Sequence, residues 1–410
     1  MTTLGLLSLL VTAAALFGWV SVRWLKLPIT IGVMLLTVGA AVCLLGVSGA
    51  APGLREGAVQ LVGQLDFQPL FLHGMLGVLL FAGAFLLDLK NLAAERTAVG
   101  ALSLVGTLLA TAATTGLMYG VARLAGVQAS WLECMFFGAL ISPTDPIAVL
   151  EMLRRVGAPK WVEAILAGES LFNDGVGAVL FLAVLDVAQG GTPSPGRIGL
   201  MLVLKSGGGL LLGVVLAKAA SELMVRVNAY QIEILLTLAV ALGGYALAER
   251  MNVSAPLEAV AAGIAMRYFN AKPPSHLISH ESIDRFWEVV DEVQNAVLFV
   301  LMGLEVLALP RSWGAIRAGV GAIVAVTLVR VVTVALVMGG VRKLQGKGDT
   351  ALLVLSWGGL RGGLALALAM SVPEANGRAW IVTATYVVVL FSVAVQGGTM
   401  NSFLRRTKAL

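Results

Sequence analysis

Residues 142–146 read Ser-Pro-Thr-Asp-Pro and residues 169–174 read Glu-Ser-Leu-Phe-Asn-Asp, both inside apolar runs long enough to span a membrane. A charged side chain at bilayer depth costs at least a few kcal/mol, so an acid kept there indicates a functional site. The two prolines also interrupt the helix at this depth, because each lacks the backbone N–H that a helix uses. The two segments therefore predict a broken helix and a polar site within a membrane protein.

The composition agrees with this class. The chain has 410 residues, of which 58% are hydrophobic and 12% charged, and its mean hydropathy is +0.92. Soluble domains carry about 25% charged residues. The apolar runs are continuous rather than alternating, which disfavours a β-barrel and predicts an all-α polytopic membrane protein. The net charge of +5 comes from dispersed basic residues, so we expect no nucleic-acid partner.

Apolar runs of about 20 residues predict thirteen membrane spans. They cover residues 3–22, 28–47, 70–87, 98–121, 131–153, 161–186, 198–225, 230–248, 254–268, 287–308, 314–340, 350–372 and 379–402. The segment 276–292 is amphipathic, and we expect it to lie at a membrane interface before the tenth span. The two cysteines, Cys43 and Cys134, fall in predicted spans, where we expect small buried side chains rather than a disulfide or a metal site.

Basic residues are distributed unequally between the connections. The odd-numbered connections and the C-terminal tail hold sixteen Lys and Arg residues, and the even-numbered connections hold seven. An excess of positive charge marks the cytoplasmic side of a membrane protein. We therefore expect the N-terminus outside and the C-terminus in the cytoplasm.

Spans five and twelve share an interruption, made by two prolines in one and by the glycine pairs 358–359 and 362–363 in the other. The two spans are seven apart and so run in opposite directions, which makes spans 1–6 and 8–13 candidate inverted repeats joined by span seven. Broken helices at matching positions are typical of a transporter's binding site. Chance is the alternative, because Gly and Pro are common in membrane helices.

Span six carries a stripe of oxygen-bearing side chains. Residues four apart share a helical face, which groups Glu169 with Asn173 and Ser170 with Asp174. The alternative is a purely structural role, in which such polar groups only hold helices together in the membrane.

Thr144 and Asp145, between the two prolines, add hydroxyl and carboxylate oxygens and freed backbone carbonyls. Hard cations such as Na⁺ prefer these ligands. Asp174 can also bind a proton, and a carboxylate that binds either a proton or a cation enforces exchange by competition. The sequence therefore predicts cation transport at this site.

Two arginines lie deep in predicted spans and need partners. Arg361 falls in the glycine-rich break, and a buried guanidinium requires a carboxylate, for which Glu169 is the candidate. This pair would keep Glu169 ionised and leave Asp174 to titrate. For Arg330, either Asp145 or the negative end of a half-helix is a possible partner.

At these motifs the chain resembles the monovalent cation:proton antiporter-1 family, the NhaP-type bacterial sodium/proton exchangers. The resemblance covers nearly the whole chain. It is carried by S-P-T-D-P at 142–146, G-E-S-L-F-N-D-G at 168–175, N-A-V-L-F-V-L-M-G-L-E at 295–305 and S-W-G-G-L-R-G-G at 356–363.

The resemblance implies one antiporter membrane domain over residues 1–410 with the NhaA/NhaP-like fold. It implies alternating access by an elevator-like motion and a homodimer. The mobile core would comprise residues of about 98–186 and 314–402, and the dimerisation scaffold about 3–87 and 198–308.

The resemblance also assigns residue roles. Asp174 is implied as the carboxylate that binds the cation and the proton. The Asn173-Asp174 pair goes with electroneutral one-for-one exchange in the family. The remaining implied residues are Thr144, Asp145 and Ser170 as Na⁺ ligands and Glu169 with Arg361 as a core ion pair. One departure is the stretch Phe81–Ala84, which lacks an acid present in several relatives; the nearest acid is Asp88.

The expected cargo is Na⁺ and H⁺, with Li⁺ and K⁺ as alternatives on the same scaffold. A cation channel is disfavoured, because it needs neither a titratable carboxylate nor paired broken helices. An enzyme is disfavoured by the absence of large polar loops and nucleophile–base motifs. We expect no cofactor, and we expect residence in a bacterial cytoplasmic (inner) membrane.

Overall fold

The structure is a computed structural model that describes residues 3–47, 67–190, 195–227, 229–270, 277–310, 312–345 and 349–406. Within these ranges the chain is helical and contains no strand. This agrees with the all-α fold class that the continuous apolar runs predict.

The helices of the first half alternate with short π-helical turns. They are α1 (Thr3–Val20), η1 (Ser21–Leu25), α2 (Ile29–Val47), α4 (Phe67–Pro69), η2 (Leu70–Met75), α5 (Leu76–Phe85), α6 (Leu89–Ala94), α7 (Arg96–Gly100), η3 (Ala101–Gly106), α8 (Thr107–Leu124), α9 (Trp131–Ile141), α10 (Ile147–Val156) and α11 (Lys160–Ala188).

The second half also alternates α-helices with short turns. Its elements are α12 (Pro195–Met224), α13 (Tyr230–Leu238), η4 (Ala239–Gly244), α14 (Tyr245–Arg250), α15 (Ala255–Asn270), α16 (Leu277–Leu304), η5 (Glu305–Leu307), α17 (Trp313–Gln345), α18 (Asp349–Trp357), α19 (Gly363–Met370), η6 (Glu374–Asn376), α20 (Arg378–Phe391), η7 (Ser392–Gly397) and α21 (Gly398–Arg406). Of the short turns, η4 and η7 are π-helical and η5 and η6 are 3-10 helical.

Nine helical stretches in the described part of the chain are long and apolar enough to cross a membrane. The other four predicted spans fall on α15, on α16 and on the interrupted pairs α9–α10 and α18–α19. These four are short, charged or broken, which is why length and composition alone do not select them.

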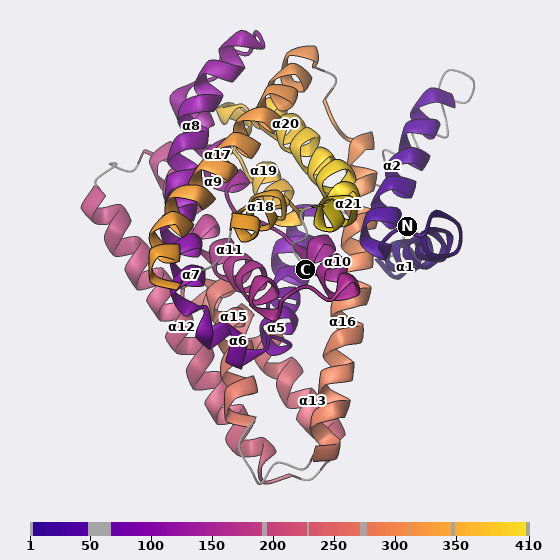
Figure 1. The fold of residues 1–410 in the computed structure, drawn as a ribbon, viewed down its shortest axis with the longest axis vertical. Helices are drawn as coiled ribbons and strands as arrows, with labels where there is room; N and C mark the ends of the chain where they lie inside the picture. The colour runs from indigo at the N-terminus through magenta and orange to yellow at the C-terminus, as the bar shows by residue number, and fades with distance from the viewer. Residues whose placement is uncertain are drawn as a thin grey trace.

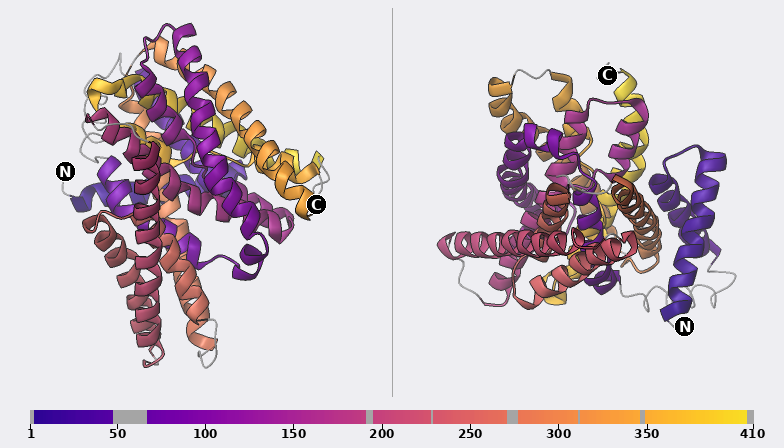
Figure 2. Two further views of the ribbon diagram at one scale, coloured as in Figure 1. Left: turned by 90° about the vertical axis from the view of Figure 1, so that its left-hand side faces the viewer. Right: turned by 90° about the horizontal axis from the view of Figure 1, so that it is seen from below.

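The helices pack in two groups. In one group α17 packs on α20 and α8, and α8 and α11 pack on α9; in the other α12 packs on α15, α15 on α5, and α16 on α2. Figure 1 shows α8, α17 and α20 in the upper part of the molecule and α12 and α13 in the lower part. The views in Figure 2 show α12 and α16 extending beyond the other helices on that side. The two groups meet along α11, α16 and α19.

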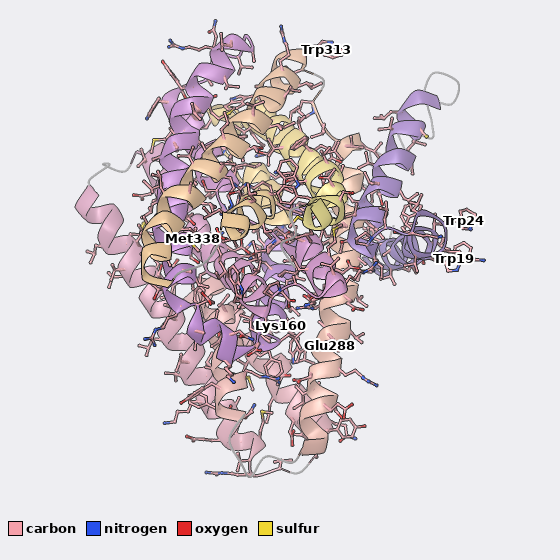
Figure 3. All side chains as sticks on the ribbon, in the orientation of Figure 1. Trp19, Trp24, Lys160, Glu288, Trp313 and Met338 are labelled. Carbon is pink, nitrogen blue, oxygen red and sulfur yellow. The ribbon has the colours of Figure 1, made fainter. Side chains whose placement is uncertain are left out.

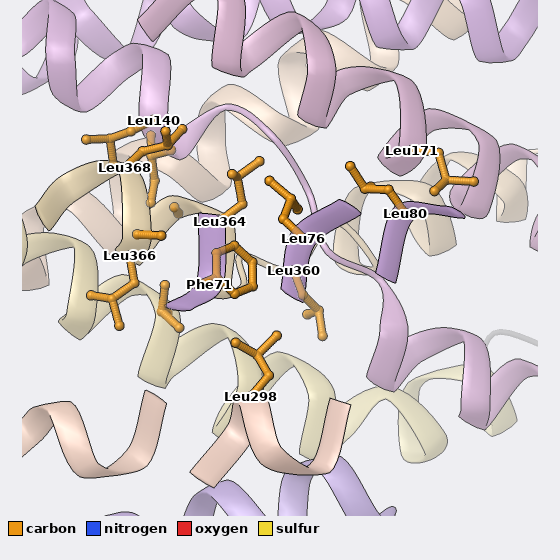
Figure 4. Packing of buried hydrophobic residues seen from close by; sticks show 14 of the residues in the cluster. Phe71, Leu76, Leu80, Leu140, Leu171, Leu298, Leu360, Leu364, Leu366 and Leu368 are labelled. Carbon is orange, nitrogen blue, oxygen red and sulfur yellow. The ribbon is translucent and has the colours of Figure 1, made fainter. Parts of the chain in front are cut away.

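Buried leucines fill this meeting zone. Leu360 and Leu364, at the break before α19 and within it, pack with Phe71 of η2 and Leu298 of α16 (Figure 4). A Cβ on Gly363 would contact Leu298 and Phe71, so glycine permits the close approach of α19 to its neighbours.

The outer surface is apolar, as expected for a protein that faces lipid. Trp19 of α1 and Trp24 of η1 project outward (Figure 3), and their exposed fractions are 58% and 69%. Aromatic residues in such positions are typical of membrane–water interfaces. Cys134 is buried as expected, but Cys43 is exposed, because no other helix of the described chain covers its face of α2.

The amphipathic segment 276–292 does not form a separate interfacial helix. Residues 277–292 are the first part of α16, which continues to Leu304 without a break; residue 276 lies outside the described residues. Trp287 is fully buried against Phe81 and Phe85 of α5, so one side of the segment is packed inside the protein. The expectation was wrong because a stripe of apolar residues can bury against protein as well as lipid.

Candidate functional site

The proline break between α9 and α10 covers residues 142–146. Pro146 has no N–H, so the carbonyl of Ser142 loses its helical hydrogen bond. Arg361 replaces it: Nη1 lies 3.2 Å from the oxygen of Ser142 and 3.1 Å from that of Pro143. The guanidinium thus satisfies the free carbonyls at the C-terminal end of α9.

The glycine break between α18 and α19 is completed in the same way by Arg330. Its Nη2 and Nε donate to the carbonyl oxygen of Leu355, at 2.9 and 3.3 Å. The C-terminal end of a helix carries free carbonyls and partial negative charge, which a cation stabilises. Each half-helix end is therefore matched with one arginine.

The two breaks touch each other. The N–H of Asp145 donates to the carbonyl of Leu360 at 2.8 Å, and Gly362 lies so close to the Asp145 carboxylate that a Cβ would overlap it. The backbone N–H of Arg361 donates to Oγ of Ser392 at 3.0 Å, which fixes the break to η7. A chain crossing of this kind is possible only where the helices have unwound.

Helix α11 is joined to the proline break by Asn173 and Thr144. Nδ2 of Asn173 donates to Oγ1 of Thr144 at 2.9 Å, and the N–H of Thr144 donates to Oδ1 of Asn173 at 3.3 Å. One turn further along α11, Gly177 lies against Pro143 with no room for a Cβ. The predicted stripe of span six thus faces the predicted break.

Glu169 forms its ion pair with Arg330 and not with Arg361. Arg330 Nη2 lies 2.9 Å from Oε2 of Glu169, and Nη1 contacts Oε1, in a two-pronged pair that is almost fully buried. The predicted Glu169–Arg361 pair is wrong, because the Arg361 guanidinium is turned to the carbonyls of the proline break. Of the two partners expected for Arg330, the half-helix end is present, whereas Asp145 forms no ion pair with it.

Of the acidic residues at the two breaks, Asp174 is the one with no hydrogen bond or ion pair in the described part of the chain. It is partly exposed, as are Asp145 and Ser170, whereas Thr144 and Asn173 are buried. Within the described residues its carboxylate accepts no hydrogen bond, and its charged neighbour is Asp145, which repels it.

Asp145 is oriented by backbone groups. Its carboxylate accepts hydrogen bonds from the N–H of Ile147, at 3.3 Å, and from the N–H of Gly363. These residues are the first of α10 and α19, so two helix N-termini, each partly positive, face one carboxylate. These two N–H groups favour the anionic form of Asp145, whereas Asp174 accepts no such hydrogen bond from the described residues.

These oxygens can hold a small hard cation. The carboxylates of Asp174 and Asp145 are close, the hydroxyl of Ser170 lies one turn before Asp174 on α11, and Thr144 adjoins Asp145. The two carboxylates repel each other and have no cationic partner among the described residues, which favours a bound monovalent cation or a proton.

Comparison with known proteins decides the family. The sequence matches the transmembrane domain of the sodium/hydrogen exchangers over residues 11–406, nearly the whole chain. The protein belongs to the sodium/hydrogen exchanger family. The expected kinship with NhaP-type proteins is confirmed.

Curated relatives within this exchanger family include two bacterial antiporters. The chain is 37% identical to the Na⁺/H⁺ antiporter NhaP of Pseudomonas aeruginosa over 412 residues, which cover 99% of this chain and 97% of the relative. It is 32% identical to the Na⁺/H⁺ antiporter NhaH of Halobacillus dabanensis over 351 residues, 83% of either chain.

A solved structure shows the exchanger fold. The sodium proton antiporter MjNhaP1 of Methanocaldococcus jannaschii superposes with a TM-score of 0.75, over 98% of each chain, at 18% identity. At this identity the match shows the fold alone, and it agrees with the expected antiporter architecture.

A small cavity lies beside the arginines of the exchanger site. It is lined by apolar residues and by Thr327, Arg330, Arg361, Ser392 and Gln396. Nε of Arg361 has no hydrogen-bond partner in the described part of the chain, and a water molecule fits such a site. Asp174 and Asp145 do not line this cavity, so it is separate from the carboxylates.

Two contacts at the glycine break were not predicted from the sequence. Ser392 accepts from the backbone of Arg361 and donates to Oε1 of Gln396 at 2.6 Å. The signal was present, since Ser392 and Gln396 are four residues apart in an otherwise apolar span.

Asp88 is the acid nearest to the stretch Phe81–Ala84, and it has a structural role. Its carboxylate accepts from the N–H of Asn91 at 3.2 Å and of Lys90 at 3.0 Å, and so caps α6. These hydrogen bonds hold the pKa of Asp88 below its usual range. No group of three His, Cys, Asp or Glu side chains in the described ranges suits a transition metal.

Proposed function

We propose that this protein is a secondary active antiporter that exchanges Na⁺ for H⁺ at the carboxylate of Asp174. The observation that carries the proposal is the isolation of this carboxylate, which is partly exposed, accepts no hydrogen bond from the described residues and lies beside Asp145. Membership of the exchanger family and the names of the curated relatives support the choice of ions.

The neighbouring polar residues are committed to other roles. Glu169 forms a buried ion pair with Arg330. Asn173 is occupied by Thr144 and has no proton to exchange. Asp174 is thus the group that alternates between a proton and a cation, with Asp145, Ser170 and the peptide at Thr144 as further oxygen ligands.

Competition for one carboxylate gives the coupling. A cation that binds Asp174 displaces one proton, and the proton that returns displaces the cation, so one Na⁺ is exchanged for one H⁺ without net charge movement. The proposed motion carries the core, residues of about 98–186 and 314–402, past a scaffold of residues of about 3–87 and 198–308. The scaffold would also form a homodimer.

The proposed location is a bacterial cytoplasmic membrane, with the N-terminus outside and the C-terminus in the cytoplasm. The excess of Lys and Arg in the odd-numbered connections supports this orientation. Exchange of Na⁺ for H⁺ in that membrane would contribute to pH homeostasis.

The experiment is cation-driven pH change in proteoliposomes with the membrane potential held at zero. Sodium, lithium and potassium are offered in turn, which identifies the cation. The wild-type protein should acidify or alkalinise the lumen according to the direction of the Na⁺ gradient, and Asp174→Asn should abolish this while leaving a folded protein in detergent. Glu222→Gln is the control, because Glu222 is exposed and its ion pair with Lys218, at 4.0 Å, lies on the surface. Substantial exchange by Asp174→Asn would refute the assignment.

A further inference from the structure

A second group of oxygens lies on α16, in the part of the helix that the positive-inside rule places toward the cytoplasm. Asp291 and Asn295 are one turn apart, and the side chain of Asn295 donates a hydrogen bond to the Asp291 carboxylate. Asn295 is only 3% exposed. Its Oδ1 has no hydrogen-bond partner among the described residues. The mechanism proposed above does not use either residue.

The surroundings of Asp291 are rich in acceptors. Oε1 of Gln294, on the same helix, is also buried without a partner in the described part of the chain. The carboxylates of Glu292 and Asp145 lie within range to repel that of Asp291. A buried acceptor without a donor is costly, and repulsion between nearby carboxylates adds to the cost.

One basic residue, Arg154 of α10, also acts on Asp291. Its side chain is 66% exposed, and its Nε lies 3.9 Å from a carboxylate oxygen of Glu163. Arg154 is therefore at the solvent side and shared, and it donates no hydrogen bond to the amide oxygens of Asn295 and Gln294. Within the described residues, these two oxygens therefore receive neither a hydrogen bond nor a contact from a positive charge.

We propose that Asp291 and the amide oxygen of Asn295 form a second monovalent-cation site, through which cations reach Asp174 from the cytoplasm. The inference rests on the proposed function and extends it. A carboxylate and amide oxygens are the ligands that Na⁺ takes in proteins. Because Asp145 belongs to the proline break and Asp291 to α16, the site lies between the two helix groups, and a cation there relieves the repulsion between their carboxylates.

The first test measures binding without transport. Purified protein is heated in detergent with NaCl or with choline chloride at equal ionic strength, and the Na⁺-dependent rise of the unfolding midpoint is recorded. Asp174→Asn should retain part of this rise, and Asp291→Asn added to it should remove the remainder. Glu281→Gln is the matched control, since Glu281 is exposed about three turns earlier on α16 and should leave the rise unchanged.

The second test measures transport from each side. In everted membrane vesicles, which present the cytoplasmic face, Asp291→Asn should raise the apparent KM for Na⁺ roughly fivefold, a loss typical of one partly solvated carboxylate ligand. In right-side-out vesicles the KM should not change. Asp291→Glu, which keeps the charge, should restore most of the affinity and shows that the loss is not a folding defect.

The outcomes separate this inference from the proposed function. If Asp174→Asn alone abolishes all Na⁺-dependent stabilisation while the wild type exchanges Na⁺ for H⁺, the second site is refuted and the function stands. If the wild type does not exchange but Asp291→Asn still removes a Na⁺-dependent rise in the midpoint, the site stands and the function fails. An equal change of KM in both vesicle types would also refute an entry site.

Discussion

At the scale of single residues, Arg330 and Arg361 have different partners, and this separates their effects on stability. Arg330 neutralises Glu169 in a buried pair, whereas Arg361 donates to the carbonyls of Ser142 and Pro143. Removal of one member of a buried ion pair leaves an uncompensated charge and costs roughly 3–5 kcal/mol. Removal of both members costs less, because no charge is stranded.

Glu169→Gln should therefore destabilise the protein by roughly 3–5 kcal/mol. Adding Arg330→Gln should recover part of the loss, so the two changes should show coupling in a double-mutant cycle of thermal stability in detergent. The matched cycle of Glu169→Gln with Arg361→Gln should show much weaker coupling. Stronger coupling with Arg361 than with Arg330 would contradict the pairing in the structure.

The sequence could identify these charged residues but not their pairing. Glu169, Arg330 and Arg361 stand out because each is an ionisable residue within an apolar span. Which arginine reaches Glu169 depends on how α11, α17 and the glycine break pack in space. The free carbonyls created by Pro146 also compete for Arg361, and neither factor is visible in spacing along the chain.

At the scale of helical elements, the crossing of the two breaks depends on Gly362. Its φ of −129° is accessible to any residue, so the constraint is space: a Cβ would overlap the Asp145 carboxylate. The same carboxylate accepts the N–H groups that begin α10 and α19. A methyl group at position 362 would thus displace a proposed ligand from both helix N-termini.

We expect Gly362→Ala to reduce the rate of sodium/proton exchange by at least about tenfold, as misplacement of a site residue by about 1 Å can. The measurement is initial rate in proteoliposomes at equal protein content. Gly339→Ala is the control, because Gly339 lies in α17 with nothing within 4 Å of the added Cβ. Full activity of Gly362→Ala would show that the crossing tolerates a shift of Asp145.

The positions of the helix breaks can be predicted from the local sequence, but the contact between the two breaks cannot. Proline removes donors wherever it occurs, and paired glycines weaken a helix, so residues 142–146 and 358–363 predict interruptions from sequence. The two interruptions touch through Asp145 and Leu360, and this contact depends on the tertiary structure. The same limit explains the misassigned segment 276–292, since a helical stripe does not say whether protein or lipid covers it.

At the scale of the whole molecule, the proposed transport cycle moves no net charge. Asn173 cannot carry a second proton, and Glu169 is already paired with Arg330. The rate of sodium/proton exchange should therefore not change when a membrane potential is imposed with a potassium ionophore. Exchange rates that change with the membrane potential would contradict one-for-one exchange. They would indicate that Asp145 is a second titrating group.

The same cycle sets the dependence of cation affinity on pH. Protonation of Asp174 excludes the cation, so the apparent affinity for Na⁺ should be constant above the pKa of this carboxyl group. As the pH falls below that pKa, the affinity should weaken by about tenfold per pH unit, because one proton is displaced for each cation bound. The measurement is the apparent KM for Na⁺ in proteoliposomes with equal pH on both sides, varied in steps.

Asp291→Asn should shift the KM without changing this slope, because the proton that competes is bound at Asp174. A KM that is flat across the whole pH range in which the protein is active would mean that proton and cation occupy different sites.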